Sequence, residues 1–197
     1  LKHHGLFFPV DVSTSSRATL GGMTGNNSCG ARSIRYGKMV DNVLGVEALL
    51  QNGEKIQFGE VDPKSLNGKH PSTRDHLLQQ LFQIGIREAD EVRQRFPEVQ
   101  RRVGGYNIDE LIPPDHGVLN PARLLVGSEG TLAFSTLIHL KLQPIPTHKV
   151  LGVCHFPSFY EAMDSTQSLV TLNPDAVELM DRTMIELARS IPQFAEK

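Results

Sequence analysis

The chain has 197 residues, which suits one domain or one domain with part of a second. Hydrophobic residues make up 39% of it, and 20 basic against 22 acidic side chains give a formal charge of −2. This balance excludes the large basic surface of a nucleic-acid-binding protein. No apolar run approaches the roughly 18 residues that cross a bilayer, and no signal peptide opens the chain. Two cysteines, Cys29 and Cys154, cannot form a disulfide framework, so we expect a reducing, cytoplasmic location.

The N-terminal segment predicts little regular structure after a first turn. Residues 1–5 are typical of the last turn of a helix that ends at Gly5, which suggests a segment cut from a longer protein. Residues 6–16 predict a short strand and then a loop. Residues 17–38 contain five glycines and predict a loop-rich stretch. Two interpretations of these glycines stay open: tight turns, or a backbone that lets N–H groups approach a phosphate or a flat ring.

A hairpin and a helical insertion follow. Residues 43–50 and 55–58 predict two strands, and Asn52-Gly53 between them favours a type I′ turn. Residues 60–120 predict a mostly helical insertion. Ser72 and Asp75 form a plausible capping pair before apolar residues at helical spacing, and Pro97 should end that helix.

The sheet is expected to resume after the insertion. Residues 123–126 predict a short strand, residues 127–131 a tight turn, and residues 132–142 a long half-buried strand with alternating apolar positions. His139 falls on the polar face of that strand. None of the eight histidines has a metal-type spacing with Asp, Glu or Cys, so we assign no metal ligands.

A second unit is predicted after residue 146, because Pro144 and Pro146 mark a boundary. In it, residues 150–156 predict a strand, and Ser158 with Glu161 predicts a capped helix to about Val170. Pro174 is expected to open a further helix. One face of that helix would carry four apolar residues, namely Val177, Met180, Met184 and Leu187. The predicted domains are therefore residues 1–146 and 147–197.

Several blocks in this order resemble one family. Residues 18–30 (ATLGGMTGNNSCG), 35–37 (RYG), 41–47 (DNVLGVE) and 125–132 (LVGSEGTL) are similar to the FAD-binding domain of the vanillyl-alcohol-oxidase-type flavoproteins. The branch concerned holds D-lactate dehydrogenases, glycolate oxidase subunits and D-2-hydroxyglutarate dehydrogenases. Residues 156–162 resemble the opening of its substrate (cap) domain. Residues 101–107 (RRVGGYN), ahead of 122–128, resemble the large members that are fused to an iron–sulfur region.

The resemblance implies an α+β fold. It would be the second half of a PCMH-type FAD-binding domain, a mostly antiparallel sheet with flanking helices and the helical insertion, followed by the start of an α+β cap domain. The front half of the pyrophosphate site would lie outside this chain. The resemblance assigns eight residues to FAD binding, namely Thr19, Gly21, Gly22, Gly25, Asn26, Ser28, Gly130 and Phe134. Asp11 and Ser16 are weaker candidates. Family members often have Ala-Thr-Asn-Ala where this chain has Gly25-Asn26-Asn27-Ser28.

The implied reaction is oxidation of a D-2-hydroxy acid, of the D-2-hydroxyglutarate or D-lactate type, to the 2-oxo acid by hydride transfer to flavin N5. The catalytic base and any metal ligands would lie outside the chain, and electrons would pass to an iron–sulfur region or another acceptor, soluble or membrane-associated. Two alternatives stay open: an isolated, non-catalytic piece that holds no FAD, and a reductase of the same fold acting on a nucleotide sugar. Arg32 and Arg35 beside Tyr36 could meet a substrate carboxylate, but a role in holding the loop to the sheet is favoured.

Overall fold

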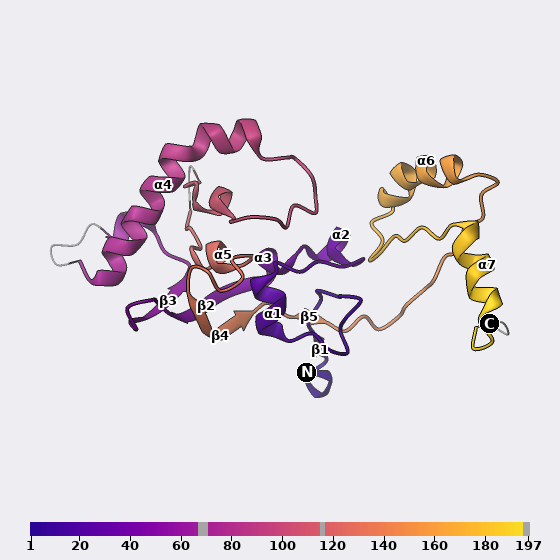
Figure 1. Ribbon diagram of the computed structural model, residues 1–197, viewed down its shortest axis with the longest axis horizontal. Coiled ribbons are helices and arrows are strands. Elements are labelled where there is room, and N and C mark those ends of the chain that lie inside the picture. The colour runs from indigo at the N-terminus through magenta and orange to yellow at the C-terminus, as the bar shows by residue number, and fades with distance from the viewer. Residues whose placement is uncertain (67–70, 115–116, 195–197) are drawn as a thin grey trace. The chain divides into compact units, whose positions relative to one another are not determined.

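The computed structural model describes residues 1–66, 71–114 and 117–194, and they divide into two compact units (Figure 1). The first is Leu1–Ile145 and the second Pro146–Lys197. Within the described ranges, no helix is both long enough and apolar enough to cross a membrane. Each unit is described by itself below.

A three-stranded antiparallel sheet is the framework of the first unit. Its order is β3 (Lys55–Gly59), β2 (Val43–Leu49) and β4 (Phe134–Leu140). The central strand β2 therefore pairs with β3, which precedes the insertion in sequence, and with β4, which follows it. A separate pair joins β1 (Leu6–Phe7) to β5 (Gln143–Pro144). The predicted hairpin is present, and β3 alternates strictly, with Ile56 and Phe58 buried.

The turn of that hairpin differs from the expected type I′. Gly53 has φ +81°, but Asn52 does not have a positive φ. The N–H of Gly53 donates to the carbonyl of Leu50 at 2.9 Å, and the N–H of Leu50 donates to the carbonyl of Glu54 at 2.9 Å. This is a three-residue loop, in which a type I turn is followed by one left-handed glycine. Only one residue with a positive φ is then needed.

Strand β4 is shorter than predicted and its alternation is interrupted. Glu47 pairs with Leu137, but Ala48 pairs with Ser135, so Thr136 is an extra residue in the ladder. Its hydroxyl donates to the carbonyl of Glu47 at 3.0 Å. The bulge reverses the faces of the residues before it. Phe134 is therefore 69% exposed and does not lie on the buried face that strict alternation would give it.

Short helices replace two of the predicted segments. The stretch expected to be loop, residues 17–38, contains α1 (Leu20–Gly25) and α2 (Ser33–Tyr36), and α3 (Met39–Asn42) follows it. Residues 123–126, predicted as a strand, lie largely in α5 (Ala122–Leu125). The carbonyl oxygen of the Asn120 side chain accepts from the N–H of Ala122 at 3.2 Å, and Pro121 precedes the first turn. A segment of only four residues has no periodicity that separates strand from helix, so these flanking signals decide.

The insertion forms as a helical unit whose two ends are tied together. It contains η2 (Pro63–Leu66), α4 (Thr73–Arg95) and η3 (Ile108–Leu111), and Val61 and Leu119 exchange backbone hydrogen bonds of 2.8 and 3.0 Å at its base. The expected capping box of Ser72 and Asp75 is present, and the helix ends before Pro97.

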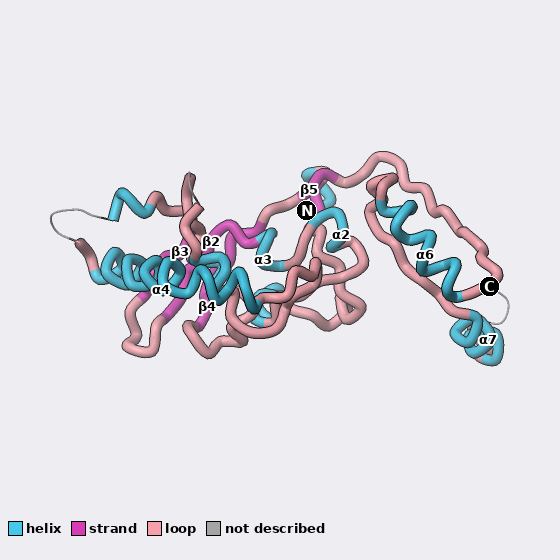
Figure 2. Tube along the Cα trace, turned by 90° about the horizontal axis from the view of Figure 1, so that it is seen from above, coloured by secondary structure: helices cyan, strands magenta, loops and turns pink. Residues whose placement is uncertain are grey.

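The core of the first unit lies between the sheet and α4, which lies above the strands in Figure 1 and runs across them in Figure 2. Leu78 and Phe82 of α4 belong to the same buried cluster as the inward residues of β2 and β3. The other members include Val43, Val46, Ile56, Phe58, Met39, Leu125 and Val126. The N-terminal turn η1 (Lys2–His4) ends at left-handed Gly5, as expected, and lies outside this core.

The second unit has two helices and no buried residue among those described. Helix α6 (Phe159–Val170) begins at Ser158, as predicted, and α7 (Arg182–Ser190) begins after Asp181. Pro174 therefore does not open a helix. Residues 151–156 have no regular structure, contrary to the predicted strand. A strand needs a hydrogen-bonding neighbour, and none of the described strands pairs with this segment.

We predict that Gly85→Ala destabilises the first unit by about 1–3 kcal/mol, because overpacking a filled core costs that much. A Cβ on Gly85 would lie 2.0 Å from the carbonyl oxygen of Leu111 and would separate α4 from η3. Urea denaturation measures the change. The control Gly104→Ala has open space around the new Cβ, so it should be neutral within about 0.5 kcal/mol. Equal stability of both variants would contradict the close packing of α4 on η3.

We predict a pH-dependent start of α4. Hydrogen bonds from the backbone N–H and hydroxyl of Ser72 lower the pKa of Asp75 below its usual 3.8, with a smaller contribution from Arg74. Because the folded-state pKa is depressed, this stabilisation is complete above pH 3.8 and is lost as the pH falls through the folded value. Ser72→Ala should raise the pKa of Asp75 in a carboxyl NMR titration. The exposed control Ser15→Ala should leave it unchanged, and an unchanged value in Ser72→Ala would contradict the cap.

Candidate functional site

The glycine-containing segment opens with a capped helical turn. The hydroxyl of Thr19 accepts from the N–H of Gly22 at 3.1 Å and starts α1. Thr19, Gly21 and Gly22 are exposed, whereas Met23 and Thr24 are buried beneath them. A Cβ on Gly21 would meet nothing within 4 Å. Apart from Leu20, which is 49% exposed, the exposed side of α1 at Gly21 and Gly22 is backbone without side-chain bulk, which suits contact with a flat ring.

The turn after α1 is fixed by Asn27, which is fully buried and left-handed with φ +49°. Its side-chain Oδ1 accepts from the N–H of Val40 at 3.0 Å. Its Nδ2 is buried and has no hydrogen-bond partner among the described residues. Beside it, Nδ2 of Asn26 donates to the hydroxyl of Ser28 at 3.2 Å. A buried donor without an acceptor costs free energy. The Nδ2 of Asn27 therefore marks a position where a ligand could supply the acceptor.

These asparagines line a cavity of about 240 Å³. Backbone and small side chains from the loop before α1 and from the insertion complete its wall. The lining residues are Val12, Ser13, Thr14, Asn26, Asn27, Ser28, Cys29 and Val103. The cavity therefore combines polar donors with small walls, as a cofactor site requires.

The structure brings the second predicted block to the same place. The N–H of Gly127 donates to the carbonyl of Thr24 at 2.9 Å, and the N–H of Glu129 donates to that of Gly25 at 3.0 Å. The turn that holds Gly130 is thereby attached to the C-terminal end of α1. Phe134 is not part of this group, because it pairs with Leu49 at the hairpin end of β2.

Gly30 and the arginines have structural partners. A Cβ on Gly30 would lie 1.4 Å from the carbonyl oxygen of Asp11, so only glycine fits there. The carboxylate of Asp11 accepts from the N–H of Arg32 at 3.0 Å and forms an ion pair with its side chain at 3.9 Å. Arg32 also lies over Phe7, and Arg35 over Tyr36. Arg32 and Asp11 thus hold the loop to the segment around β1, and Ser16 is exposed.

The insertion covers the predicted cofactor loop. Arg101 donates to the carbonyl of Gly30 at 2.9 Å, and Gln100 to that of Ile34 at 3.5 Å. Further along, the hydroxyls of Tyr106 and Thr131 lie 2.8 Å apart. Residues 100–106 thus contact both the loop after α1 and the turn before β4.

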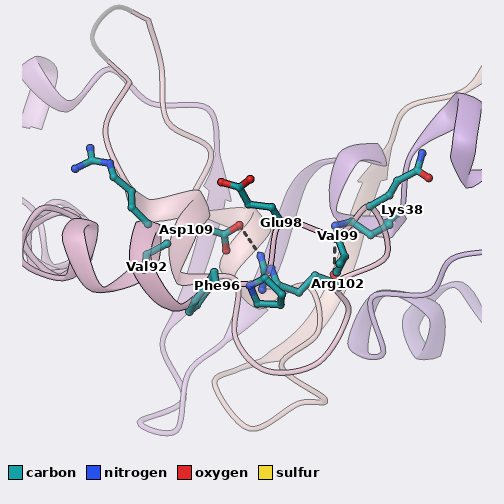
Figure 3. Close-up of a pocket in the computed structure, with 10 residues that line it drawn as sticks. Lys38, Val92, Phe96, Glu98, Val99, Arg102 and Asp109 are labelled. Carbon is teal, nitrogen blue, oxygen red and sulfur yellow. Dashed lines mark hydrogen bonds and ion pairs between the residues drawn. The ribbon is translucent and has the colours of Figure 1, made fainter.

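A larger cavity of about 410 Å³ is lined mainly by the C-terminal end of α4 and the segment that follows it (Figure 3). Arg102 forms an ion pair with Asp109 there and stacks over Phe96 at 4.6 Å from the ring centroid. Lys38 donates to the carbonyl of Arg102 at 3.2 Å. The three cations that line it, Lys38, Arg93 and Arg102, already have hydrogen-bond or ion-pair partners, which favours a structural role for this cavity.

We find no metal-binding cluster among the described residues. None of their His, Cys, Asp and Glu side chains form a group of three or more that could hold a metal ion. Cys29 is partly buried and Cys154 exposed, and both are free thiols.

From the sequence, Asn27 was a possible donor of the glycine-rich stretch, but the resemblance did not assign it to FAD, and Val103 and Glu129 were not predicted for the site. Val103 reaches the cavity only through the fold of the insertion. The left-handed backbone of Asn27 and Glu129 has only a weak sequence signal, because asparagine tolerates that conformation and glutamate seldom adopts it.

Comparisons with known proteins identify the family of the chain. Residues 1–59 match the model of an FAD binding domain, and residues 145–196 match the C-terminal domain of FAD linked oxidases. D-2-hydroxyglutarate dehydrogenases of Haemophilus influenzae and Escherichia coli are each 33% identical, over 194 and 191 residues. A mitochondrial D-lactate dehydrogenase [cytochrome] of Arabidopsis thaliana is 29% identical over 187 residues.

The matches cover 96%, 96% and 94% of this chain but only 19%, 19% and 24% of those proteins. The chain thus spans about a fifth of the length of its first curated relatives. Two different domain models of one family match it in order, and the segment between them aligns with the same relatives. The chain belongs to the FAD-linked oxidase family, in its D-2-hydroxyglutarate and D-lactate dehydrogenase branch.

Proposed function

We propose that this chain is part of an FAD-dependent oxidoreductase that oxidises a D-2-hydroxy acid, of the D-2-hydroxyglutarate or D-lactate type, to the 2-oxo acid. The printed names of its relatives support the substrate class. The match of residues 145–196 to the C-terminal domain of FAD linked oxidases favours this reaction over reduction of a nucleotide sugar. Residues 1–146 would then contribute to the FAD-binding domain and residues 147–197 would begin the cap domain.

The unpartnered amide of Asn27 carries the cofactor part of the proposal. Its Nδ2 is a buried donor beside a cavity with polar walls, and FAD is rich in acceptors. Ser28 and Asn26 would add donors from the same wall. Gly21 and Gly22 would let the flavin lie against the backbone of α1, and Thr19 would keep that turn in place through its hydrogen bond to Gly22. Gly25 and Gly130 would line the same region through the attached turn, and Phe134 is the most distant of the proposed contacts.

FAD, when bound, supplies the acceptor for the hydride of the substrate. The residues of this chain would bind and orient it. The proton of the substrate hydroxyl would go to a base outside the chain. We propose that electrons then leave to an iron–sulfur region or another acceptor. The chain covers 19% of the D-2-hydroxyglutarate dehydrogenases but 24% of the plant D-lactate dehydrogenase, so the former are longer and have room for such a region. A reducing compartment suits the two free thiols.

These residues by themselves would hold FAD weakly. The cavity of about 240 Å³ is smaller than the roughly 300–1,000 Å³ of typical cofactor and ligand sites. The rest of the FAD surface would have to be covered by parts of the enzyme beyond these residues. The small cavity thus favours an inactive 197-residue chain within a larger protein that is an enzyme.

We predict that the full-length protein purifies with flavin absorbance and reduces a dye acceptor with D-2-hydroxyglutarate or D-lactate. The L enantiomers serve as controls and should be at least about tenfold poorer, because a bound substrate of the wrong hand misplaces its hydrogen. The 197-residue chain alone should be colourless. Absence of turnover with any 2-hydroxy acid would overturn the proposed reaction, and a yellow, stoichiometric isolated chain would overturn the argument from cavity size.

We predict that Asn27→Asp weakens FAD binding about tenfold or more, which corresponds to about 1.4 kcal/mol. Aspartate tolerates the left-handed backbone and keeps the acceptor for the N–H of Val40, but it loses the Nδ2 donor and adds a charge. Flavin fluorescence titration of the full-length apoprotein measures the change.

Asn42→Asp is the matched control, since Asn42 is also buried but its Nδ2 already donates to the carbonyls of Tyr36 and Lys38. That variant should lower the melting temperature and leave FAD affinity of the folded protein unchanged. Equal FAD affinity in Asn27→Asp and wild type would remove Asn27 from the site.

A further inference from the structure

The loop that follows α1 is held at Gly30 by backbone contacts. A Cβ on Gly30 would lie 1.4 Å from the carbonyl oxygen of Asp11, so no side chain can anchor the loop at this position. Its N–H donates to the hydroxyl of Ser33 at 3.0 Å, a partner only three residues away. Glycine has more backbone freedom to lose than any other residue. A contact from a distant segment that fixes Gly30 therefore restricts the conformation of this loop strongly.

Arg101 supplies such a contact from the insertion. Its guanidinium Nη2 donates to the carbonyl of Gly30 at 2.9 Å, across 71 positions of sequence. A guanidinium is a charged donor, and charged donors form the stronger hydrogen bonds of proteins. The contact is exposed to solvent, so its net contribution to the stability of the whole unit is modest. Its main effect is therefore on the conformation of the loop and not on the fold.

The segment that carries Arg101 is itself fixed in place. The next residue, Arg102, forms an ion pair with Asp109 and stacks over Phe96 at 4.6 Å from the ring centroid. The carbonyl of Arg102 accepts from Nζ of Lys38 at 3.2 Å. The insertion and the segment after α1 thus hold each other in both directions, because Arg101 reaches from the insertion and Lys38 reaches back to it.

These contacts lie beside the proposed cofactor cavity. Ser28 and Cys29 of the loop line the cavity of about 240 Å³, and so does Val103 of the insertion. The Nδ2 of Asn27, which has no hydrogen-bond partner among the described residues, belongs to the same wall. A shift of the loop at Gly30 would therefore move the donors that line the cavity.

We propose that Arg101 is a positioning residue. Its hydrogen bond to the carbonyl of Gly30 keeps the loop in the conformation that receives FAD, without contact between Arg101 and the cofactor. The inference rests on the proposed FAD site and adds a residue of the insertion that acts on it. Such a contact raises affinity because the loop is ordered before the cofactor binds, so less conformational entropy is lost on binding.

The test compares Arg101→Ala, Arg101→Lys and wild type in the full-length apoprotein. Cys29 reports the state of the loop, since it is a partly buried free thiol. Its alkylation by N-ethylmaleimide, followed for each peptide by mass spectrometry, should be about threefold faster or more in Arg101→Ala, because a loop that opens more often exposes its thiol. Cys154 is the internal control. It is an exposed thiol of the second unit, and its rate should not change.

The affinity for FAD, measured by flavin fluorescence titration, should fall about three- to tenfold in Arg101→Ala. Arg101→Lys keeps the charge and a donor but not the planar fork, so its affinity and its Cys29 rate should lie between those of Arg101→Ala and wild type. The melting temperature of both variants should stay within about 2 °C of wild type, since the contact is exposed.

Arg95→Ala is the matched control. Arg95 is an exposed arginine of the insertion whose partner is Glu91, at 2.7 Å on the same helix. Removal of its side chain leaves the contact to Gly30 in place. This variant should match wild type in Cys29 alkylation, FAD affinity and melting temperature.

The outcomes separate this inference from the one on which it rests. Wild-type protein that binds no FAD would overturn the proposed function and the role of Arg101 with it. Wild-type protein that binds FAD, together with unchanged affinity in Arg101→Ala, would overturn the role of Arg101 alone. Weaker binding with an unchanged Cys29 rate would also overturn it, since Arg101 would then act on the cofactor directly. A melting temperature lowered by more than about 2 °C in both variants would assign the contact to the stability of the fold instead.

Discussion

The hydrogen bond from the N–H of Val40 to the side chain of Asn27 is the constraint on which the candidate site depends. It lies in a fully buried turn and links the end of α1 to α3, which leads directly into the central strand β2. A Cβ on Gly127 would lie only 3.2 Å from the Cβ of Asn27, so the turn before β4 must pass close to the same side chain. The side chain of Asn27 thus contacts three segments: the end of α1, α3 and the turn before β4. Its Oδ1 accepts from the N–H of Val40, so Nδ2 is the atom that remains for a ligand.

The sequence was most informative where the determining signal is local. Ser72 with Asp75 and Ser158 with Glu161 predicted where two helices begin, and both starts are found. A capping side chain and its backbone partner lie three residues apart, so no tertiary information is needed. The β2–β3 hairpin was predicted for the same reason, although its turn was assigned to the wrong type, because the number of loop residues with positive φ depends on how the strands pair.

Predictions failed where distant contacts decide. Residues 123–126 could be strand or helix by composition, and Asn120 and the packing of Leu125 on the core make them helical. Residues 132–142 alternate in sequence, but the bulge at Thr136, bonded to β2, reverses part of the strand. The family blocks could be recognised from sequence. Their order does not predict the hydrogen bonds of residues 127–129 to α1 or the hydrogen bond of Arg101 to Gly30. These contacts join residues about 70 to 100 positions apart.

The glycines between residues 17 and 38 need not share one explanation. Gly30 allows the close approach of Asp11, and Gly37 has φ +77° and lies against the carboxylate of Asp41, so both are required by the fold. Gly21 has no neighbour that would exclude a side chain and no positive φ. Inside a helical turn it costs about 1 kcal/mol relative to alanine. A residue that weakens its own helix, and for which the packing gives no reason, points to something outside the protein that must approach the backbone at that position. Of the two interpretations of the glycine cluster, turns and close backbone contacts account for Gly30 and Gly37, whereas for Gly21 we propose the other, a backbone that a flat ring can approach.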